Sequence, residues 1–317
     1  MKKCYTLFFI TFIIFLNFSC KREITPAYLL LCEDDFKDCI HVANFNSVHE
    51  TTYDDEELEA IKQQNFRDVL VSLNGKELGY WQLPCKIPLL PNYSDKNYVR
   101  ILPCARVPYT SLTAVPYYFL SPVEQFFEME REGEYRLSNF KVEYVPSVAF
   151  PILETFSQTT VFKPFDTIFP TPMEIFYDKD YYEKDKGKNV GKIALKDSVD
   201  FFNVVTSYFT LNGRGVRQFW EMYYKCDSGE MITYLNFQNS ASGVPQQDMI
   251  VFPATATWKK VYIDLTDIIT WACGSADRIS VRLGIRGYPS QNNEKENAKN
   301  SYFYFGNIKV ITMSAPY

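Results

Sequence analysis

The sequence predicts an all-β protein built from two sandwich-like units. Aromatic residues make up 17% of the 317-residue chain, with 23 Tyr and 26 Phe, whereas only 13 residues are Gly. Aromatic side chains favour strands because they pack well on a pleated, half-buried surface. Short alternating runs separated by turn residues recur along the chain, and no segment has the spacing of a long amphipathic helix. A chain of this length corresponds to about two domains.

The first unit is expected over residues 26–148 as a small Ig-like β-sandwich that acts as a spacer. Its clearest signal is at 68–83, where two alternating runs flank Asn74-Gly75. This turn needs positive φ at both central positions, which Asn and Gly tolerate, so a hairpin is predicted. The acidic stretch 47–64 is predicted to be an exposed loop or a short helical turn. Further strands are expected at 28–32, 98–103, 125–130 and 135–144, the last two forming a hairpin.

The second unit is expected over residues 151–317 as a sandwich or jelly roll. Several short strands separated by polar turns are typical of these architectures. The charged stretch 178–192 and the Asn-, Gln-, Glu- and Lys-rich stretch 289–300 are predicted to be loops. The strand-like runs lie at 201–209, 218–224, 231–237, 258–265, 279–285 and 302–311.

The N-terminal residues have the arrangement of an export signal. Two lysines at positions 2 and 3 precede an apolar run over residues 4–18, and Ser19-Cys20 follow. A run of about fifteen apolar residues is too short to span a bilayer comfortably, which favours a cleaved signal over a permanent helix.

This pattern resembles a bacterial lipoprotein signal. The resemblance implies a signal peptide over 1–19, lipidation of Cys20 as the first mature residue, and a short tether over 20–25. Asn17 departs from the family pattern, which usually has Leu at that position. The alternative is a buried cysteine that follows a signal anchor.

Net charge argues against nucleic acid as a partner. Without Lys2 and Lys3 the mature chain has 31 basic and 38 acidic residues, a net charge of −7. Such a balance repels phosphate backbones.

The cysteines of the mature chain beyond Cys20 permit disulfides, because an exported protein meets an oxidising compartment. Spacing does not fix connectivity, so the pairs to test first are Cys32 with Cys39 and Cys85 with Cys104. The remaining two are Cys226 and Cys273.

Two family resemblances cover nearly the whole mature chain. The first unit resembles an N-terminal module of outer-membrane lipoproteins of Bacteroidota, through residues 24–29, 68–90, 101–103, 116–118 and Pro122. The second unit resembles galactose-binding-like and carbohydrate-binding-module jelly rolls, through residues 258–266 and 304–310. Together they imply a lipid-anchored protein of the outer membrane. The mixed Lys21-Arg22-Glu23 leaves open whether it faces the periplasm or the cell surface.

The jelly-roll resemblance also bears on calcium. In such domains an ion often bridges an early loop and the last strand, which implies Asp166 as the candidate metal ligand. Calcium needs several oxygen ligands, and Gly306 stands where the family usually has an acidic residue. A protein without a cofactor is therefore expected.

Little in the sequence favours catalysis. The conspicuous acidic residues occur in charge runs, which are usually solvated faces. His41 and His49 have no Gly-x-Ser-x-Gly companion, and the absence of Cys-x-x-Cys disfavours zinc. Gly213-Arg214-Gly215 lacks the Lys-Ser/Thr of a phosphate loop. The chain is not expected to be an enzyme.

Binding is the better hypothesis. Sugar rings stack on flat aromatic side chains, and their hydroxyls seek forked donors and carboxylates. Trp271 and Tyr288 lie next to turn residues and are the preferred exposed aromatics. Arg282 and Arg286 alternate with apolar residues, which places both on one solvent-facing side of a strand, where they bind ligand or merely solubilise the sheet. The leading function is glycan binding by the second unit; the alternative is a structural subunit that docks on an outer-membrane protein complex. Other aromatic candidates, more typical of a core, are Trp220, Tyr223 and Tyr234.

Overall fold

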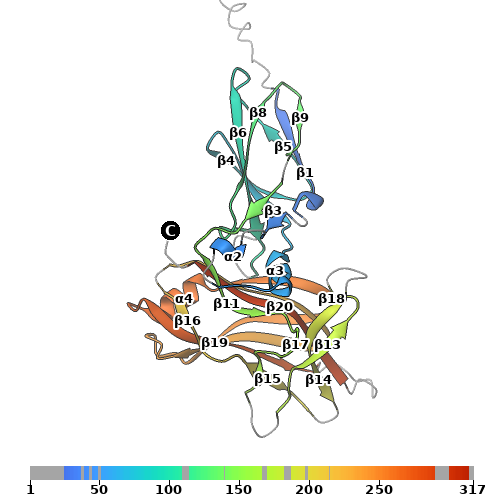
Figure 1. Ribbon diagram of the computed structural model, residues 1–317, viewed down its shortest axis with the longest axis vertical. Coiled ribbons are helices and arrows are strands. Elements are labelled where there is room, and N and C mark those ends of the chain that lie inside the picture. The colour runs from blue at the N-terminus through green and yellow to red at the C-terminus, as the bar shows by residue number, and fades with distance from the viewer. Residues whose placement is uncertain are drawn as a thin grey trace, which may run out of the picture.

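The computed structural model confirms the all-β class: strands dominate, and the sheets form β-sandwiches (Figure 1). It describes residues 25–36, 39–42, 45–48, 51–108, 114–138, 140–165, 170–181, 187–196, 199–213, 215–289 and 300–313. Cys20, Asp166 and His49 therefore lie outside the described residues. Among the described helices, none is long and apolar enough to cross a membrane.

The first unit is a sandwich of two sheets with the strand orders β5-β1-β9 and β4-β3-β6-β7, and β8 also pairs with β6. Their inner faces form one apolar core, to which Leu29, Ile87, Val71 and Ile101 contribute. The elements are β1 (Ala27–Leu31), η1 (Glu33–Phe36), β2 (Ile40–His41), α2 (Phe45–Val48), α3 (Asp55–Lys62), β3 (Asp68–Leu73), β4 (Lys76–Gln82), β5 (Cys85–Leu89), β6 (Lys96–Ala105), β7 (Val115–Pro116), β8 (Val123–Glu128), β9 (Glu134–Tyr135) and β10 (Val142–Glu143).

Local sequence signals explain two of these elements. The β3–β4 hairpin is confirmed, with φ of 52° at Asn74 and 78° at Gly75. The acidic stretch forms α3, because Asp54 and Glu57 make a reciprocal capping box that satisfies the first free amides of the helix. Ile61 on the opposite face of α3 is fully buried.

The hairpin predicted over residues 125–144 is wrong. Strand β8 pairs with β6, whereas β9 crosses to the other sheet and pairs with β1 in parallel. The crossing packs the partly buried Tyr135 against the core between the sheets, beside Phe127. Alternating residues predict a strand but not its partner, so the sequence pattern is the same for both topologies.

The predicted disulfides are also wrong: all six described cysteines are free thiols. Cys85 lies on β5 and Cys104 on β6, which belong to different sheets. Cys104 packs with Leu70 and Leu102 on the side of its sheet away from the main core.

The second unit is one ten-stranded sheet folded into two layers. The elements of the second unit are β11 (Val148–Glu154), β12 (Lys163–Pro164), β13 (Glu174–Asp178), β14 (Lys188–Lys196), β15 (Phe202–Val205), β16 (Phe209–Asn212), β17 (Gln218–Gln238), β18 (Gln246–Asp264), α4 (Thr266–Cys273), β19 (Arg278–Tyr288) and β20 (Asn300–Met313). We call the layer that contacts the first unit, which includes β20 and the first half of β17, the proximal layer. The other layer, which includes β19 and the second half of β17, is the distal layer.

A long hairpin joins the two layers. The strands predicted at 218–224 and 231–237 are one continuous strand, β17, whose first half pairs with β20 and whose second half pairs with β19. The bend lies at Gly229, with φ of 100°, where an added Cβ would be 2.2 Å from the Tyr288 carbonyl oxygen. Only glycine fits this close approach. The core between the layers includes Trp220, Leu235, Leu283, Phe303 and Phe305.

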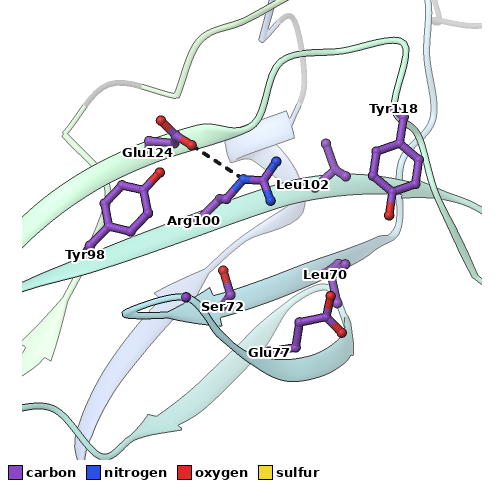
Figure 2. A pocket seen from close by; sticks show the side chains of 9 residues that line it. Leu70, Ser72, Glu77, Tyr98, Arg100, Leu102, Tyr118 and Glu124 are labelled. Carbon is purple, nitrogen blue, oxygen red and sulfur yellow. Dashed lines mark ion pairs between the residues drawn. The ribbon is translucent and has the colours of Figure 1, made fainter. Parts of the chain in front are cut away.

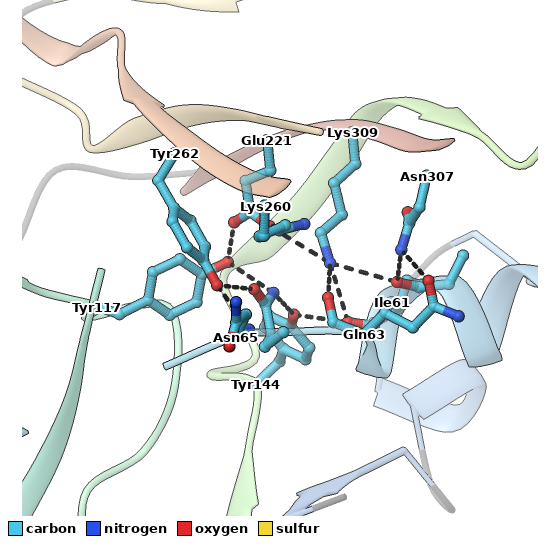
Figure 3. Close-up of polar contacts among 12 residues, drawn as sticks. Ile61, Gln63, Asn65, Tyr117, Tyr144, Glu221, Lys260, Tyr262, Asn307 and Lys309 are labelled. Atoms are coloured by element: carbon cyan, nitrogen blue, oxygen red, sulfur yellow. Dashed lines mark hydrogen bonds and ion pairs between the residues drawn. The ribbon is translucent and has the colours of Figure 1, made fainter. Parts of the chain in front are cut away.

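A buried charge cluster fastens the first unit to the proximal layer (Figure 3). Glu221 on β17, Lys260 on β18 and Lys309 on β20 all have fully buried side chains. Glu221 Oε2 lies 3.1 Å from Lys260 Nζ and 3.5 Å from Lys309 Nζ. The Tyr117 hydroxyl, which comes from the first unit, donates to Glu221 Oε1. Burying these charges is tolerable only because each has partners.

The same cluster reaches the end of α3. Lys309 Nζ donates to the carbonyl oxygens of Ile61 at 3.1 Å and of Ala60 and Gln63 at 3.4 Å. Asn307 Nδ2 donates to the Ala60 oxygen at 2.7 Å. The last carbonyls of a helix lack helical partners and carry partial negative charge, so a lysine is a suitable cap.

An apolar contact surrounds the charges. Phe219 packs edge-on against Phe119 with ring centroids 5.4 Å apart, and Tyr262 stacks on Phe66 at 6.1 Å. These residues belong to the same core cluster as the interior of the first unit. The two units therefore share a continuous hydrophobic core, which fixes their relative orientation.

We expect Lys309 to make stability rise with pH. Burial lowers its pKa from 10.5 to about 7, and the attraction of Glu221 offsets this only in part. Between these two values the unfolded chain holds a proton that the folded chain has released, so folding becomes more favourable as pH increases. The free energy of unfolding of the wild type relative to Lys309→Met should grow by about 2 kcal/mol from pH 7 to pH 9.

Urea denaturation at a series of pH values measures this difference. Lys96→Met is the matched control, because the Lys96 side chain is 70% exposed and should show no such trend. A wild-type advantage over Lys309→Met that is constant with pH would contradict the prediction.

Candidate binding site

The outer face of the distal layer carries a set of ordered polar and aromatic side chains. On β19, Val281, Leu283 and Ile285 point into the core and are fully buried, whereas Arg282 and Arg286 alternate with them and point outward. We define the arginine–aromatic face as Phe165, Phe201, Asn203, Tyr208, Tyr234, Asn236, Gln246, Asp248, Arg282, Arg286 and Tyr288. These residues come from β15, β17, β18, β19 and the segments that lead into β15 and β16 or follow β12.

Arg282 is held in a defined position. Its guanidinium lies over the rings of Phe165 and Tyr208, 4.8 Å from each centroid. Its Nε donates to Asn236 Oδ1 at 3.1 Å. Phe165 and Tyr208 are 48% and 43% exposed, so the outer surfaces of both rings remain accessible to a ligand. Cation–π contacts of this kind stabilise a fixed guanidinium without neutralising it.

Arg286 has different surroundings, because a carboxylate neutralises it. Its Nη2 donates to Asp248 Oδ2 at 2.5 Å, and the guanidinium lies 5.5 Å from the centroid of Tyr234. The Tyr234 hydroxyl in turn donates to Asn203 Oδ1 at 2.5 Å. Burial raises the pKa of Tyr234, so its hydroxyl keeps its proton.

A chain of amide groups links the two arginines. Asn236 Nδ2 donates to Gln246 Oε1 at 3.0 Å, and Gln246 Nε2 donates to Asp248 Oδ1 at 3.3 Å. Asn236 and Asp248 are also the partners of Arg282 and Arg286, respectively. The face is thus a connected network, ordered before any ligand arrives, which lowers the entropy lost on binding.

Gly284, between the two arginines on β19, is required by this packing. A Cβ at this position would lie 2.1 Å from the Tyr234 ring. The ring therefore lies flat over the strand, opposite Gly284 in the β17–β19 register.

The structure brings together three of the four residues predicted from sequence. Tyr288 lies at the end of β19 beside Phe201, with ring centroids 6.5 Å apart and planes tilted by 30°. Trp271 is 46% exposed but lies on α4, which supplies none of the residues of the arginine–aromatic face. The other three aromatic candidates are all buried: Trp220 in the core between the layers, Tyr223 in a separate cluster with Tyr181 and Val190, and Tyr234 beneath Arg286.

Sequence reasoning missed most of the remaining residues. Phe165, Tyr208, Asn236 and Asp248 reach Arg282 and Arg286 only through strand pairing. No local signal in the sequence shows which strands are neighbours. Among the described residues, no group of three or more His, Cys, Asp and Glu is arranged to hold a metal ion.

A depression lies on the first unit, on the outer surface of the sheet formed by β4, β3, β6 and β8 (Figure 2). It has a volume of about 380 Å³. Arg100 points into it, but its Nε lies 3.4 Å from Glu124 Oε1. This arginine is therefore already neutralised, unlike Arg282. The other lining residues include Leu70, Leu102, Glu77 and Tyr118.

No protein-family model matches the chain, and no curated protein matches it. Several of the solved structures that resemble about half of it contain carbohydrate-binding modules; others are an adhesin domain and a phage tailspike domain. The Clostridium thermocellum family 11 module in complex with a β-1,3-1,4-mixed-linked tetrasaccharide is 12% identical, with a TM-score of 0.32, covering 53% of this chain and 96% of the module.

A xylan-binding family 22 module from Paenibacillus barcinonensis is 11% identical, with a TM-score of 0.34, covering 51% of this chain and 98% of the module. A C. thermocellum xylanase fragment with a family 22 module, complexed with xylohexaose, is 8% identical with a TM-score of 0.35. The match covers 51% of this chain and 28% of that one.

We expect Gly284→Ala to disturb the arginine–aromatic face. The added methyl group collides with the Tyr234 ring, so the ring must tilt and weaken its bond to Asn203. Overpacking of this kind should lower the free energy of unfolding by about 1–3 kcal/mol, measured by urea denaturation. Ser280→Ala on the same strand is the control and should change it by less than about 0.5 kcal/mol. Equal stability of the two variants would contradict the described packing.

Proposed function

We propose that this protein is a non-catalytic, lipid-anchored component of the outer membrane that binds glycans through the arginine–aromatic face. The observation that supports this most is Arg282, a fixed guanidinium over two exposed aromatic rings. Aromatic rings suit the C–H faces of sugars, and forked guanidinium donors suit their oxygens.

The orientation of the two units leaves the arginine–aromatic face accessible to a ligand. The first unit covers the proximal layer through Glu221, Lys260 and Lys309, so the distal layer faces away from it. The described chain begins with β1 at the end of the first unit remote from the ten-stranded sheet (Figure 1). A lipid on Cys20 would attach five residues before Thr25, at that remote end. The arginine–aromatic face would then point away from the membrane.

The chemistry of the face supports binding without catalysis. Glycoside hydrolysis normally needs two carboxyl groups placed on either side of the scissile bond. The arginine–aromatic face as defined has one carboxylate, Asp248, and that group already accepts hydrogen bonds from Arg286 and Gln246. Asp248 is therefore suited to orient a ligand hydroxyl.

One observation favours the alternative of an assembly role. Ile175, Phe176 and Tyr177 on β13 are 37%, 39% and 62% exposed, and β13 is an edge strand among those described. An exposed apolar edge is a place where another chain can add a strand. If the protein captured an outer-membrane protein, and Tyr177→Lys abolished the capture while no glycan bound, the assembly role would replace glycan binding.

We expect the mature protein to bind at least one polysaccharide in affinity gel electrophoresis, with Tyr208→Ala weakening binding about tenfold. This change removes a ring that both positions Arg282 and offers a stacking surface, which corresponds to about 1–1.5 kcal/mol. Trp271→Ala is the matched control, because it removes an exposed aromatic outside the face and should leave affinity unchanged. Loss of binding in Trp271→Ala, with Tyr208→Ala unaffected, would place the site on α4 instead.

Lipid attachment is tested separately. Metabolic labelling with an alkyne fatty acid should tag the wild-type protein and fail to tag Cys20→Ser, because the thiol is the group that is acylated. Cys4→Ser, within the expected signal peptide, should label like the wild type. Equal labelling of wild type and Cys20→Ser would refute the anchor.

A further inference from the structure

Arg282 differs in its charge balance from Arg286, its neighbour on the arginine–aromatic face. Arg100, Arg106 and Arg286 each form an ion pair with a carboxylate, whereas Arg282 forms none with any described residue. Arg282 therefore brings to this face a positive charge that no described carboxylate balances. A guanidinium in a fixed position, with no carboxylate partner among the described residues, can pair with an anionic group of a ligand.

The donors of Arg282 are partly used and partly available. Nε is occupied by Asn236 Oδ1 at 3.1 Å. The two terminal amino groups have no acceptor among the described residues, and neither of them is buried. Because Asn236 holds Nε and two rings hold the plane of the guanidinium, these amino groups are presented in a fixed orientation. Two parallel N–H donors in this geometry match the two oxygens of a carboxylate or a sulfate.

The ion pair of Arg286 and Asp248 lies on the same face as Arg282 and has no net charge. Arg286 and Asp248 form a closed ion pair that offers donors and acceptors but no net charge. The two arginines lie four residues apart on β19, which corresponds to about 13 Å along the strand. A ligand that spans both must therefore carry its anion at one end and hydroxyl groups at the other.

The net charge of the whole chain disfavours a general attraction to polyanions. The mature chain has an expected net charge of −7, with 31 basic and 38 acidic residues. Any preference for an anionic ligand must then arise locally, at Arg282, and not from the overall field. The recognition is expected to be stereospecific and not simply electrostatic.

We infer that the arginine–aromatic face selects an anionic glycan, with Arg282 binding the carboxylate or sulfate group of one sugar residue. This inference rests on the proposed glycan-binding function and narrows it to a ligand class. Tyr208 and Phe165 hold the guanidinium in position for the anion. Asp248 and Arg286 bind the hydroxyls of a neighbouring residue.

Matched polymers test the inference on the full mature chain. Polygalacturonate is compared with its methyl ester, and dextran sulfate with dextran, so that carboxylate and sulfate are examined separately. Affinity is measured by gel electrophoresis and calorimetry in the presence of physiological salt.

The wild type should bind at least one anionic polymer about tenfold or more tightly than its neutral partner. Arg282→Gln should lose that preference, and Arg282→Lys should retain part of it. Arg100→Gln, in the depression of the first unit, is the matched control and should keep the full preference.

Several results would overturn the inference. Equal binding of an anionic polymer and its neutral partner by the wild type would refute anion selection but leave glycan binding intact. An undiminished preference in Arg282→Gln would refute the role of this residue. Equally tight binding of inorganic polyphosphate would show non-specific attraction. If no polysaccharide of any kind bound, the proposed function would fail together with the inference.

Discussion

The buried contact of Glu221 with Lys260 and Lys309 determines what the rest of the molecule can do. The carboxylate and the two amino groups of this solvent-free junction require continuous partners, and these come from both units. Burial pushes the pKa of Glu221 upward, but the two lysines outweigh it and hold that pKa below its ordinary value. Separation of the units would expose the apolar contact and remove the carbonyl and tyrosine partners of these charges. The junction therefore behaves as part of a core and not as a flexible hinge.

This junction decides which face of the second unit is available. The outer side of the proximal layer is covered, whereas the outer side of the distal layer carries the arginine–aromatic face. Strand β17 connects the two: Glu221 lies on its first half, and Tyr234 and Asn236 lie on its second. The bend at Gly229 carries this strand from one layer to the other. The residues that fix the junction and those that form the face are thus parts of one continuous element.

Sequence alternation was sufficient for some features and insufficient for others. The alternation of side chains along β19 placed Arg282 and Arg286 on one side of that strand, and Asn74-Gly75 predicted the β3–β4 hairpin. Both features could be predicted because their signals are local. The neighbours of Arg282 are not local: Phe165 and Tyr208 are more than seventy residues away in the sequence. Strand pairing alone brings them together, which is also why the predicted hairpin over 125–144 failed.

Lys309 and Glu221 illustrate the same limit for charged residues. In the sequence each is a charge in an alternating strand, a pattern typical of a solvent-facing side. Their burial follows from the docking of α3 and Tyr117, which lie more than a hundred residues earlier. The acidic residues at the start of α3 led to the prediction of an exposed segment. One side of the helix is exposed, but Ala60 and Ile61 on the other side are buried.

Hydrogen–deuterium exchange of the mature protein, with and without a bound polysaccharide, tests the central claim most directly. The account predicts that the ligand slows exchange in residues 203–210, 232–238 and 279–288, while the segments around Glu221, Lys260 and Lys309 are protected in both states. Ligand-induced protection confined to β3, β4 and β6 of the first unit, or to α4, would contradict it.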